Sequence, residues 1–265
     1  MTDAIKQLEE SLWAFWAHFG KPEGGKLTNT PEEMWFETPI AALPYNGVLR
    51  MRATDDIEAV LDRHFNHFAE KKKPFFWLLH PTATPAELDV RLRTRGFDEI
   101  ERIEGMVAPL NEIAPDGEDP AGTEIREVKD HDDVDGLIDF VMWRWQVPEY
   151  GNAYVRGMRD AFRLGDAGTP VRCWMAWKDG KPVAKAFTME TDGAIGLYAV
   201  ATRPEARGMG LGRAVCLRAL RETDRGRGML GVLHSTPMAI GLYQKMGFKH
   251  VVPFRLFAKP DGFQF

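Results

Sequence analysis

Residues 207–212, Arg-Gly-Met-Gly-Leu-Gly, are the part of the chain whose spacing most clearly predicts chemistry. They follow an apolar segment, Ala194–Val200, that is typical of a strand, and they precede a segment with helical spacing. A glycine-rich turn at a helix N-terminus offers main-chain N–H groups to a phosphate. Tyr243, in a later predicted helix, could give a proton to a leaving group. The pattern predicts a pyrophosphate-bearing ligand and a reaction that ends in protonation of a leaving group.

The turn does not match the two commonest nucleotide-binding glycine motifs. A dinucleotide fingerprint starting at Gly208 would need glycine where Arg213 stands, and no acidic residue ends a strand about twenty residues further on. A P-loop ends in Gly-Lys-Ser/Thr, whereas this turn ends in Gly212-Arg-Ala. What remains is an Arg/Gln-x-x-Gly-x-Gly/Ala pattern, in which missing side chains let a pyrophosphate approach the main chain closely.

The elements that must position these residues lie in the C-terminal half, after a linker-like segment rich in proline, glycine and acid at 111–122. Strands are predicted at 124–128, 171–177, 182–190, 194–200, 229–234 and 249–257, and helices at 132–145, 153–164, 212–224 and 237–246. This order predicts an α+β fold, with a mixed central sheet flanked by helices.

The N-terminal half repeats this order in part. It has predicted helices at 3–19, 55–71 and 85–95, and predicted strands at 34–37, 47–53, 75–80 and 97–110. Trp77-Leu-Leu-His80, followed by Gly96-Phe97, parallels Gly231-Val-Leu-His234, followed by Gly247-Phe248. We therefore predict a tandem duplication, with units at 1–115 and 122–265. The first unit lacks the glycine turn and has Leu92 where the second has Tyr243, so it is the degenerate one.

The turn, the Leu242-Tyr243-x-Lys245-x-Gly247-Phe248 ending and the element order together resemble the GNAT superfamily of acyl-CoA-dependent N-acyltransferases. The resemblance implies that acetyl-CoA is the donor and that the amides of Arg207, Gly208, Met209, Gly210, Leu211 and Gly212 hold its pyrophosphate. It also implies that main-chain groups of Val200, Ala201 and Thr202 pair with the pantetheine arm, and that an N–H near Val200 polarises the thioester. Tyr243 would protonate the thiolate, since a phenol pKa of about 10 is near a thiol pKa of about 8.5.

The chain departs from this superfamily at three positions. Thr236 stands where many members have asparagine and contact the cofactor, while Gly231 and Ala194 stand where some members have a glutamate base. No general base is therefore inherited. Glu190, Tyr198 and His234 are candidates by position only, with a structural role as the alternative for each, and a water relay or a neutral amine would need none of them.

The resulting hypothesis is an N-acyltransferase that moves an acetyl or short acyl group to a small-molecule or peptide amine by direct attack, without a metal. Two alternatives remain: a non-catalytic acyl-CoA sensor, which the missing base supports, and a partner-binding scaffold protein. Trp143, Trp145, Glu149 and Tyr150 lie where the acceptor would enter, and core packing of the two tryptophans is the alternative. His64 and His67 lie one helical turn apart without a visible third ligand, which favours a structural role.

Composition narrows the class further. The chain has 265 residues, a net charge of −5 and a pI near 5.9, which argues against general nucleic-acid binding. Its two cysteines, Cys173 and Cys216, lie in apolar segments and are expected to be buried reduced thiols. No apolar run approaches the length of a membrane span and no signal core is seen, so we expect a cytoplasmic protein that does not enter the membrane. The oligomeric state stays open, a homodimer included.

Overall fold

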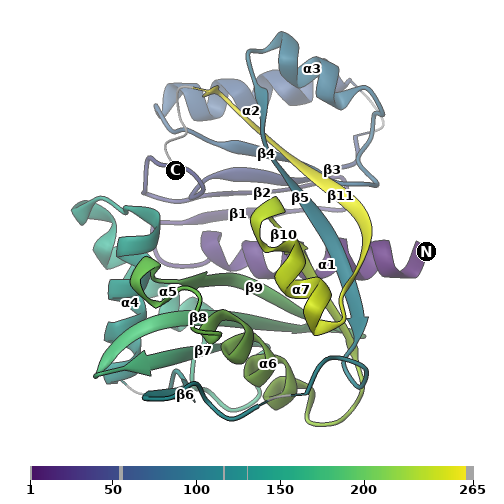
Figure 1. The fold of residues 1–265 in the computed structure, drawn as a ribbon. Helices are drawn as coiled ribbons and strands as arrows, with labels where there is room; N and C mark the ends of the chain where they lie inside the picture. The colour runs from purple at the N-terminus through teal and green to yellow at the C-terminus, as the bar shows by residue number, and fades with distance from the viewer. Residues whose placement is uncertain (1, 54–55, 116, 130, 261–265) are drawn as a thin grey trace.

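The computed structural model describes residues 2–53, 56–115, 117–129 and 131–260. Within these ranges eleven strands form one sheet in the order β1-β2-β3-β4-β11-β5-β10-β9-β8-β7-β6 (Figure 1). The strands are β1 Lys26–Asn29, β2 Glu33–Glu37, β3 Gly47–Met51, β4 Phe76–Leu79, β5 Asp98–Pro109, β6 Thr123–Glu127, β7 Val171–Lys178, β8 Lys181–Thr191, β9 Ala194–Thr202, β10 Leu230–Ser235 and β11 Lys249–Ala258.

Helices cover both faces of this sheet. They are α1 Thr2–Ala17, α2 Ile57–Glu70, α3 Leu88–Thr94, α4 His131–Trp145, α5 Asn152–Phe162, α6 Leu211–Asp224 and α7 Ile240–Met246, with 3₁₀ turns η1 His18–Gly20, η2 Glu149–Gly151, η3 Pro204–Ala206 and η4 Pro237–Ala239. The predicted α+β fold is confirmed. The sequence did not reveal β1, which is short and half exposed and has no alternating apolar pattern. None of the described helices is long and apolar enough to cross a membrane.

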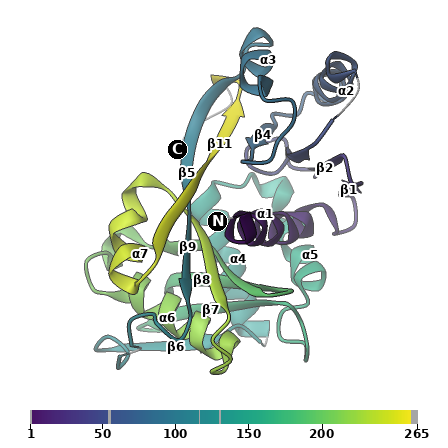
Figure 2. The ribbon, with the colours of Figure 1, turned by 90° about the vertical axis from the view of Figure 1, so that its right-hand side faces the viewer.

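The two halves of the chain exchange strands in the centre of the sheet. β5, from the first half, pairs with β10 on one side and β11 on the other, and β11, the last strand, also pairs with β4. Figure 2 shows β5 and β11 running together from one half to the other. The units predicted at 1–115 and 122–265 therefore share one continuous sheet, and we retain them as a proposal for the duplicated segments.

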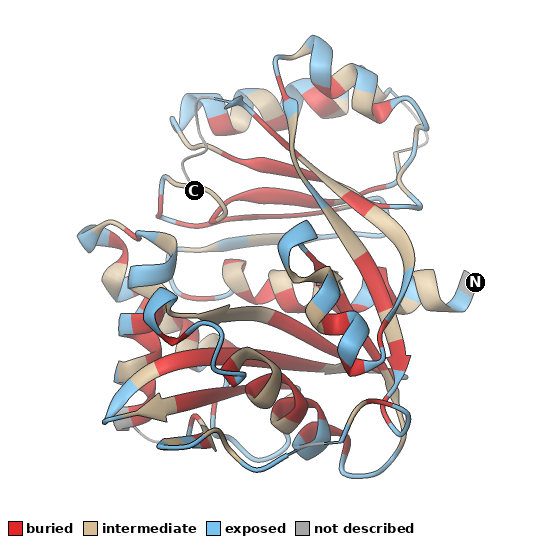
Figure 3. Cartoon of the chain, in the orientation of Figure 1, coloured by how far each residue is buried: buried red, intermediate tan, exposed pale blue. Residues whose placement is uncertain are grey.

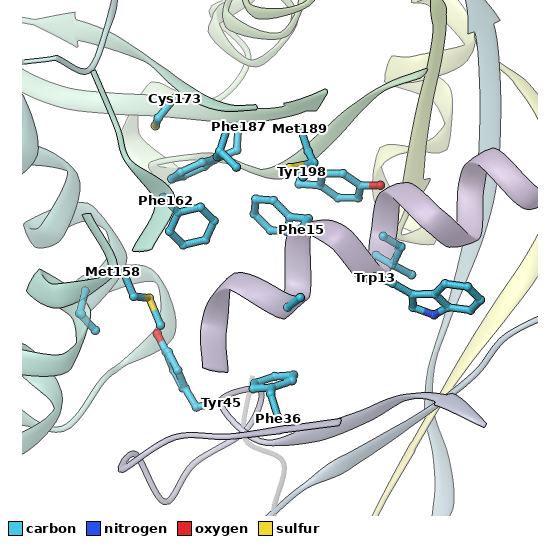
Figure 4. Packing of buried hydrophobic residues seen from close by; sticks show 14 of the residues in the cluster. Trp13, Phe15, Phe36, Tyr45, Met158, Phe162, Cys173, Phe187, Met189 and Tyr198 are labelled. Carbon is cyan, nitrogen blue, oxygen red and sulfur yellow. The ribbon is translucent and has the colours of Figure 1, made fainter. Parts of the chain in front are cut away.

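Helix α1 lies between the two halves and contributes to the core of both (Figure 2). On one side, Phe15 stacks on Tyr198 of β9 with ring centroids 4.6 Å apart. On the other side, Trp16 packs against Phe36 of β2 at 6.0 Å. Figure 4 shows Phe36 and Tyr45 on one side of α1, and Tyr198 on the other. This position explains the wide apolar face of α1, since burying one such aromatic side chain contributes about 1.5–3 kcal/mol.

Burial follows the strands and the inward faces of the helices (Figure 3). Cys173 and Cys216 are both buried and unbridged, which confirms the expectation for the thiols. One ring nitrogen of His64 is hydrogen-bonded to Glu33 and one of His67 to Glu37, each at 2.8 Å, which agrees with a structural role. In the described part of the chain, no group of three or more His, Cys, Asp or Glu side chains is arranged to hold a metal ion.

Candidate functional site

The glycine turn connects β9 and η3 to the N-terminus of α6. Gly208 and Gly210 have φ values of 76° and 78°, a left-handed conformation that is strained for any residue with a Cβ. An added Cβ at either position would meet nothing within 4 Å, so the surface of the turn is open. Gly212 serves a different purpose, because a Cβ there would lie 3.2 Å from Thr202 Oγ1, a closer contact than Cβ atoms normally make.

The turn leaves main-chain donors without partners. The N–H of Ala214 donates to the carbonyl oxygen of Gly210, the first hydrogen bond of α6. Within the described structure, the amides from Gly208 to Arg213 have no backbone or side-chain acceptor. A run of free amides at the positive end of a fourteen-residue helix fits a pyrophosphate group.

Strands β9 and β10 separate beside this turn. They pair in parallel only between Ala194–Leu197 and Leu230–Leu233. Further along β9, the register with β8 shifts between Lys185 and Phe187, and Ala199 takes a φ of 49°. Such a bulge redirects the strand. One edge of β9 from Tyr198 to Thr202 is therefore not paired with β10, and it can take an extended ligand arm as an added strand.

A cavity of about 240 Å³ occupies the gap between the two strands. β9 lines it with Val200 and Ala201, and the segment after β10 lines it with Thr236. The first half of the chain contributes as well, through α1, the loop before β3, and Glu101 of β5. The predicted residues Val200, Ala201, Thr236, His234 and Tyr243 thus come together around one cavity, whose other walls include side chains that the sequence did not single out.

Tyr243 lies on α7 with its phenol at the cavity wall. Its side chain is buried, and no described residue forms a hydrogen bond with the phenol oxygen. Burial raises the pKa of Tyr243 well above its usual value of 10, and nearby Cys216 raises it further. From the sequence we expected the pKa of the Tyr243 phenol to lie close to that of the departing thiol. Burial of the phenol increases the difference between the two pKa values. The phenol stays protonated, and a thiolate formed in the same buried space would have a raised pKa too.

His234 is the last residue but one of β10 and also lines the cavity. Both ring nitrogens are buried without a hydrogen-bond partner among the described residues. The ring packs edge-on against Phe254 at 4.4 Å and parallel to Tyr198 at 6.1 Å. Burial lowers the pKa of His234 to about 3, so the imidazole is neutral at physiological pH. A neutral, unpartnered imidazole can orient a bound amine or a water molecule, although it is a weak base.

The other two base candidates are located differently. Glu190 lies near the far end of β8, opposite Ile195, and forms an ion pair with Arg227 at 2.6 Å. It is not among the residues that line the cavity, so the structure does not bring it to Tyr243. Tyr198 does line the cavity, but its phenol donates a hydrogen bond to Ser11 Oγ at 2.8 Å.

The two tryptophans of α4 have different surroundings. Trp145 lines the cavity, whereas Trp143 is partly exposed and stacks against the guanidinium of Arg203 at 4.7 Å. Tyr150 is exposed, and its phenol oxygen accepts a hydrogen bond from the N–H of Ala41 at 3.2 Å.

Lys185 is a functional candidate that the sequence reasoning missed. Its side chain is buried in β8, and its ammonium donates a hydrogen bond to the carbonyl oxygen of Ala199 in the bulge at 2.6 Å. Burial lowers the pKa of Lys185 to about 8. A usable signal was present, because Lys185 is the only charged residue in the apolar run Val183-Ala-Lys-Ala-Phe187. Buried lysines without a carboxylate partner are rare and cluster at functional sites.

Comparison with known proteins identifies a family and a fold to which this chain is similar. Residues 169–250 match the model of the acetyltransferase (GNAT) domain. The structure is similar to a GCN5-related N-acetyltransferase from Kribbella flavida, at 16% identity and a TM-score of 0.66, over 96% of this chain and 95% of that one. It is also similar to a tandem GNAT protein from the clavulanic acid biosynthesis pathway, at 14% identity and a TM-score of 0.63, over 97% of this chain and 94% of that one. A search of curated proteins finds no match.

A GNAT domain model therefore matches residues 169–250, and the chain as a whole has the fold of these GNAT structures, a mixed sheet with flanking helices. GNAT enzymes in general transfer acyl groups from acetyl-CoA to amines. The free amides of the turn, the unpaired edge of β9 and the adjacent cavity fit a donor of that shape.

Proposed function

We propose that the protein is an N-acyltransferase that moves an acetyl or short acyl group from acetyl-CoA to an amine. One observation carries the proposal: a single cavity between β9 and β10 joins the bulge at Ala199 and Val200 to the unpartnered phenol of Tyr243. The glycine turn at the N-terminus of α6 follows the same strand after η3. An unpaired strand edge for the donor's arm and a proton donor therefore line one cavity, and the pyrophosphate seat lies further along the same segment.

The donor side is formed mainly by main chain. The free amides of residues 208–212 would hold the pyrophosphate, whereas the N–H of Arg207, also expected from the sequence, already donates to the carbonyl oxygen of Pro204. Main-chain groups of Val200, Ala201 and Thr202 would pair with the pantetheine arm. The N–H near Val200 would stabilise negative charge on the thioester oxygen, a contribution of about 3–4 kcal/mol for one well-placed donor. Thr236, at the cavity wall, offers a hydroxyl to the same arm.

The reaction then needs one proton transfer at each side. The amine nitrogen attacks the acyl carbon, a C–N bond forms and the C–S bond breaks. The phenol of Tyr243 gives its proton to the departing sulfur. The amine nitrogen loses one proton as the amide forms, and this proton restores the phenol through solvent. His234, neutral and unpartnered, orients the nitrogen or a water molecule beside it.

A thiol-release assay with acetyl-CoA and a broad panel of amines tests the proposal. Tyr243→Phe should lower kcat by roughly 10²- to 10⁴-fold, the usual contribution of a positioned acid, and should leave acetyl-CoA binding unchanged. Tyr150→Phe is the matched control and should keep full activity, because the structure leaves this exposed tyrosine outside the cavity lining, contrary to its expected place at the acceptor entrance. Acetyl-CoA binding without turnover, unaffected by Tyr243→Phe, would favour a sensor instead.

A further inference from the structure

We infer that the acceptor is a cationic amine with an apolar, aromatic-sized body, and that Glu101 of the N-terminal half binds its ammonium group and accepts its proton. The inference rests on the proposed acyl transfer and specifies its acceptor side. It also gives the degenerate half a chemical role, since β5 carries this carboxylate into the cavity.

Glu101 differs from the other acids of its strand. The carboxylates of β5 are those of Asp98, Glu99, Glu101 and Glu104. Glu99 is bound by Arg255 at 2.8 Å, Glu104 by Arg102 at 3.1 Å, and Asp98 by Arg93 at 3.3 Å. Glu101 lines the cavity, and no described residue forms an ion pair or hydrogen bond with its carboxylate. A half-buried carboxylate without a hydrogen-bonded cation among the described residues leaves room for a cationic ligand.

The groups around Glu101 come from four other elements. Arg144 of α4, Lys185 of β8, His234 of β10 and Tyr243 of α7 line the same cavity. Burial raises the pKa of Glu101, and the charge of Arg144 only partly opposes this. A carboxylate in this state is a better proton acceptor than one in water, while remaining able to bind an ammonium group.

Arg144 is influenced by the donor side as well as by Glu101. Its guanidinium stacks over Trp145 at 4.6 Å, and burial and the charge of Arg207 lower its pKa, while the charge of Glu101 opposes them. Arg207 begins the glycine turn. Bound phosphate at the turn would neutralise this pair of cations, leaving the Glu101 carboxylate and the Lys185 ammonium, which already donates to Ala199, as the charged groups toward the acceptor.

The remaining walls are aromatic and apolar. α1 contributes Phe15 and Trp16, η1 contributes Phe19, and Tyr45 and Trp145 line the same cavity. A second, strongly apolar cavity of about 60 Å³ shares Phe15, Phe19, Tyr45 and Trp145 with the first. An aromatic or branched apolar body fits this surface, and the rings favour a nearby cation.

The chemistry balances without a further reactant. The ammonium gives one proton to the Glu101 carboxylate, and the neutral nitrogen attacks the acyl carbon. The C–N bond forms, the C–S bond breaks, and the sulfur leaves with the proton of Tyr243. The second nitrogen proton restores the phenol through solvent, and the carboxylic acid of Glu101 releases its proton to solvent.

Calorimetric titration of 2-phenylethylamine into the full chain saturated with coenzyme A tests the inference. Wild type should bind, and Glu101→Gln should bind roughly ten- to a hundredfold more weakly, the range expected for losing one charged hydrogen bond. Glu104→Gln, three residues along β5 and paired with Arg102, is the matched control and should bind as wild type does. Neutral 2-phenylethanol should bind equally weakly to wild type and to Glu101→Gln.

The outcomes separate this inference from the proposed function. Equal amine affinity in wild type and Glu101→Gln overturns the role of Glu101. Coenzyme A binding without any amine binding at millimolar concentration overturns the acceptor class and leaves acyl transfer standing. No coenzyme A binding at all overturns both. Thermal melting of each variant checks that the isosteric change has left the fold intact.

Discussion

Replacing Lys185 by methionine tests two effects of this buried lysine: the stability that the fold loses by burying its charge, and its contribution to the activity of the site. Lys185 lies on β8, and its buried ammonium is over the ring of Phe187 at 5.0 Å. The ammonium donates a hydrogen bond to the carbonyl oxygen of Ala199 in the bulge. Burial, the main cause, and the charge of Arg144 lower its pKa from 10.5 to about 8. Methionine has a similar length and shape and carries no charge.

The magnitude follows from linkage between pKa and stability. A difference of about 2.5 pKa units corresponds to roughly 3 kcal/mol. Below pH 8 the lysine is protonated in both states, so the whole penalty acts on the folded protein. Between pH 8 and 10.5 the unfolded chain binds more protons than the folded one, and the penalty is relieved. The stability of wild type relative to Lys185→Met should therefore rise with pH across this window.

Urea unfolding of both proteins at pH 7, 8, 9 and 10 measures this difference directly. We expect wild type to gain on Lys185→Met by up to about 3 kcal/mol across the series. Lys181→Met, at the exposed start of the same strand, controls for the general loss of a lysine. At pH 7.5 Lys185→Met should also lose activity. The bulge presents Val200, and in this variant the carbonyl oxygen of Ala199 in the bulge loses its hydrogen bond from Lys185. A pH-independent difference in stability would refute the account of Lys185.

Three further predictions concern the turn, the acid stability and the contact between halves. Gly210→Ala and Gly226→Ala each place a Cβ at a φ near 77° in open space, so each should cost about 1–2 kcal/mol of stability. Only Gly210→Ala should weaken acetyl-CoA binding in calorimetry. If both variants bound acetyl-CoA equally well, the role of the turn would be contradicted. Glu37, whose pKa is lowered to about 2 by its hydrogen bonds to Lys71, Lys73 and His67 despite burial, should stabilise the fold at neutral pH. The deficit of Glu37→Gln in urea unfolding should be about 2–3 kcal/mol at pH 7 and should shrink as pH falls from 4.5 towards 2, and a constant deficit would contradict it. Phe15→Ala should cost about 3–5 kcal/mol in the same assay, since its ring packs between the halves, and a loss below 1 kcal/mol would contradict that packing.

Features that depend on local sequence were predictable. The glycine turn, the helix after it and the position of Tyr243 follow from spacing within a few residues, and the element order follows from apolar periodicity. The strand exchange was not predictable in this way, because the pairing of β5 with β10 and β11 joins residues more than 120 positions apart and leaves no local pattern.

The side chains of the acceptor side illustrate the same limit. Glu101 is one of four acids in β5, and only the three-dimensional pairing shows that the other three are neutralised. Lys185 carried a signal in its apolar surroundings, but its contact with Ala199 depends on a bulge that the sequence does not reveal. Glu190 was a candidate base only because of its position in a predicted strand. The register of β8 with β9 places it near the end of β8 that lies away from Lys185 and the bulge.

Calorimetric titration of acetyl-CoA into the full chain tests the central claim most directly. The C-terminal half has the glycine turn and the tyrosine, and the N-terminal half has neither, so we predict one binding event per chain. Chemical-shift or crosslinking changes on binding should cluster at the turn, the edge of β9 and the cavity residues Thr236 and Tyr243. No binding at millimolar acetyl-CoA, or a second site of equal affinity in the N-terminal half, would contradict the account.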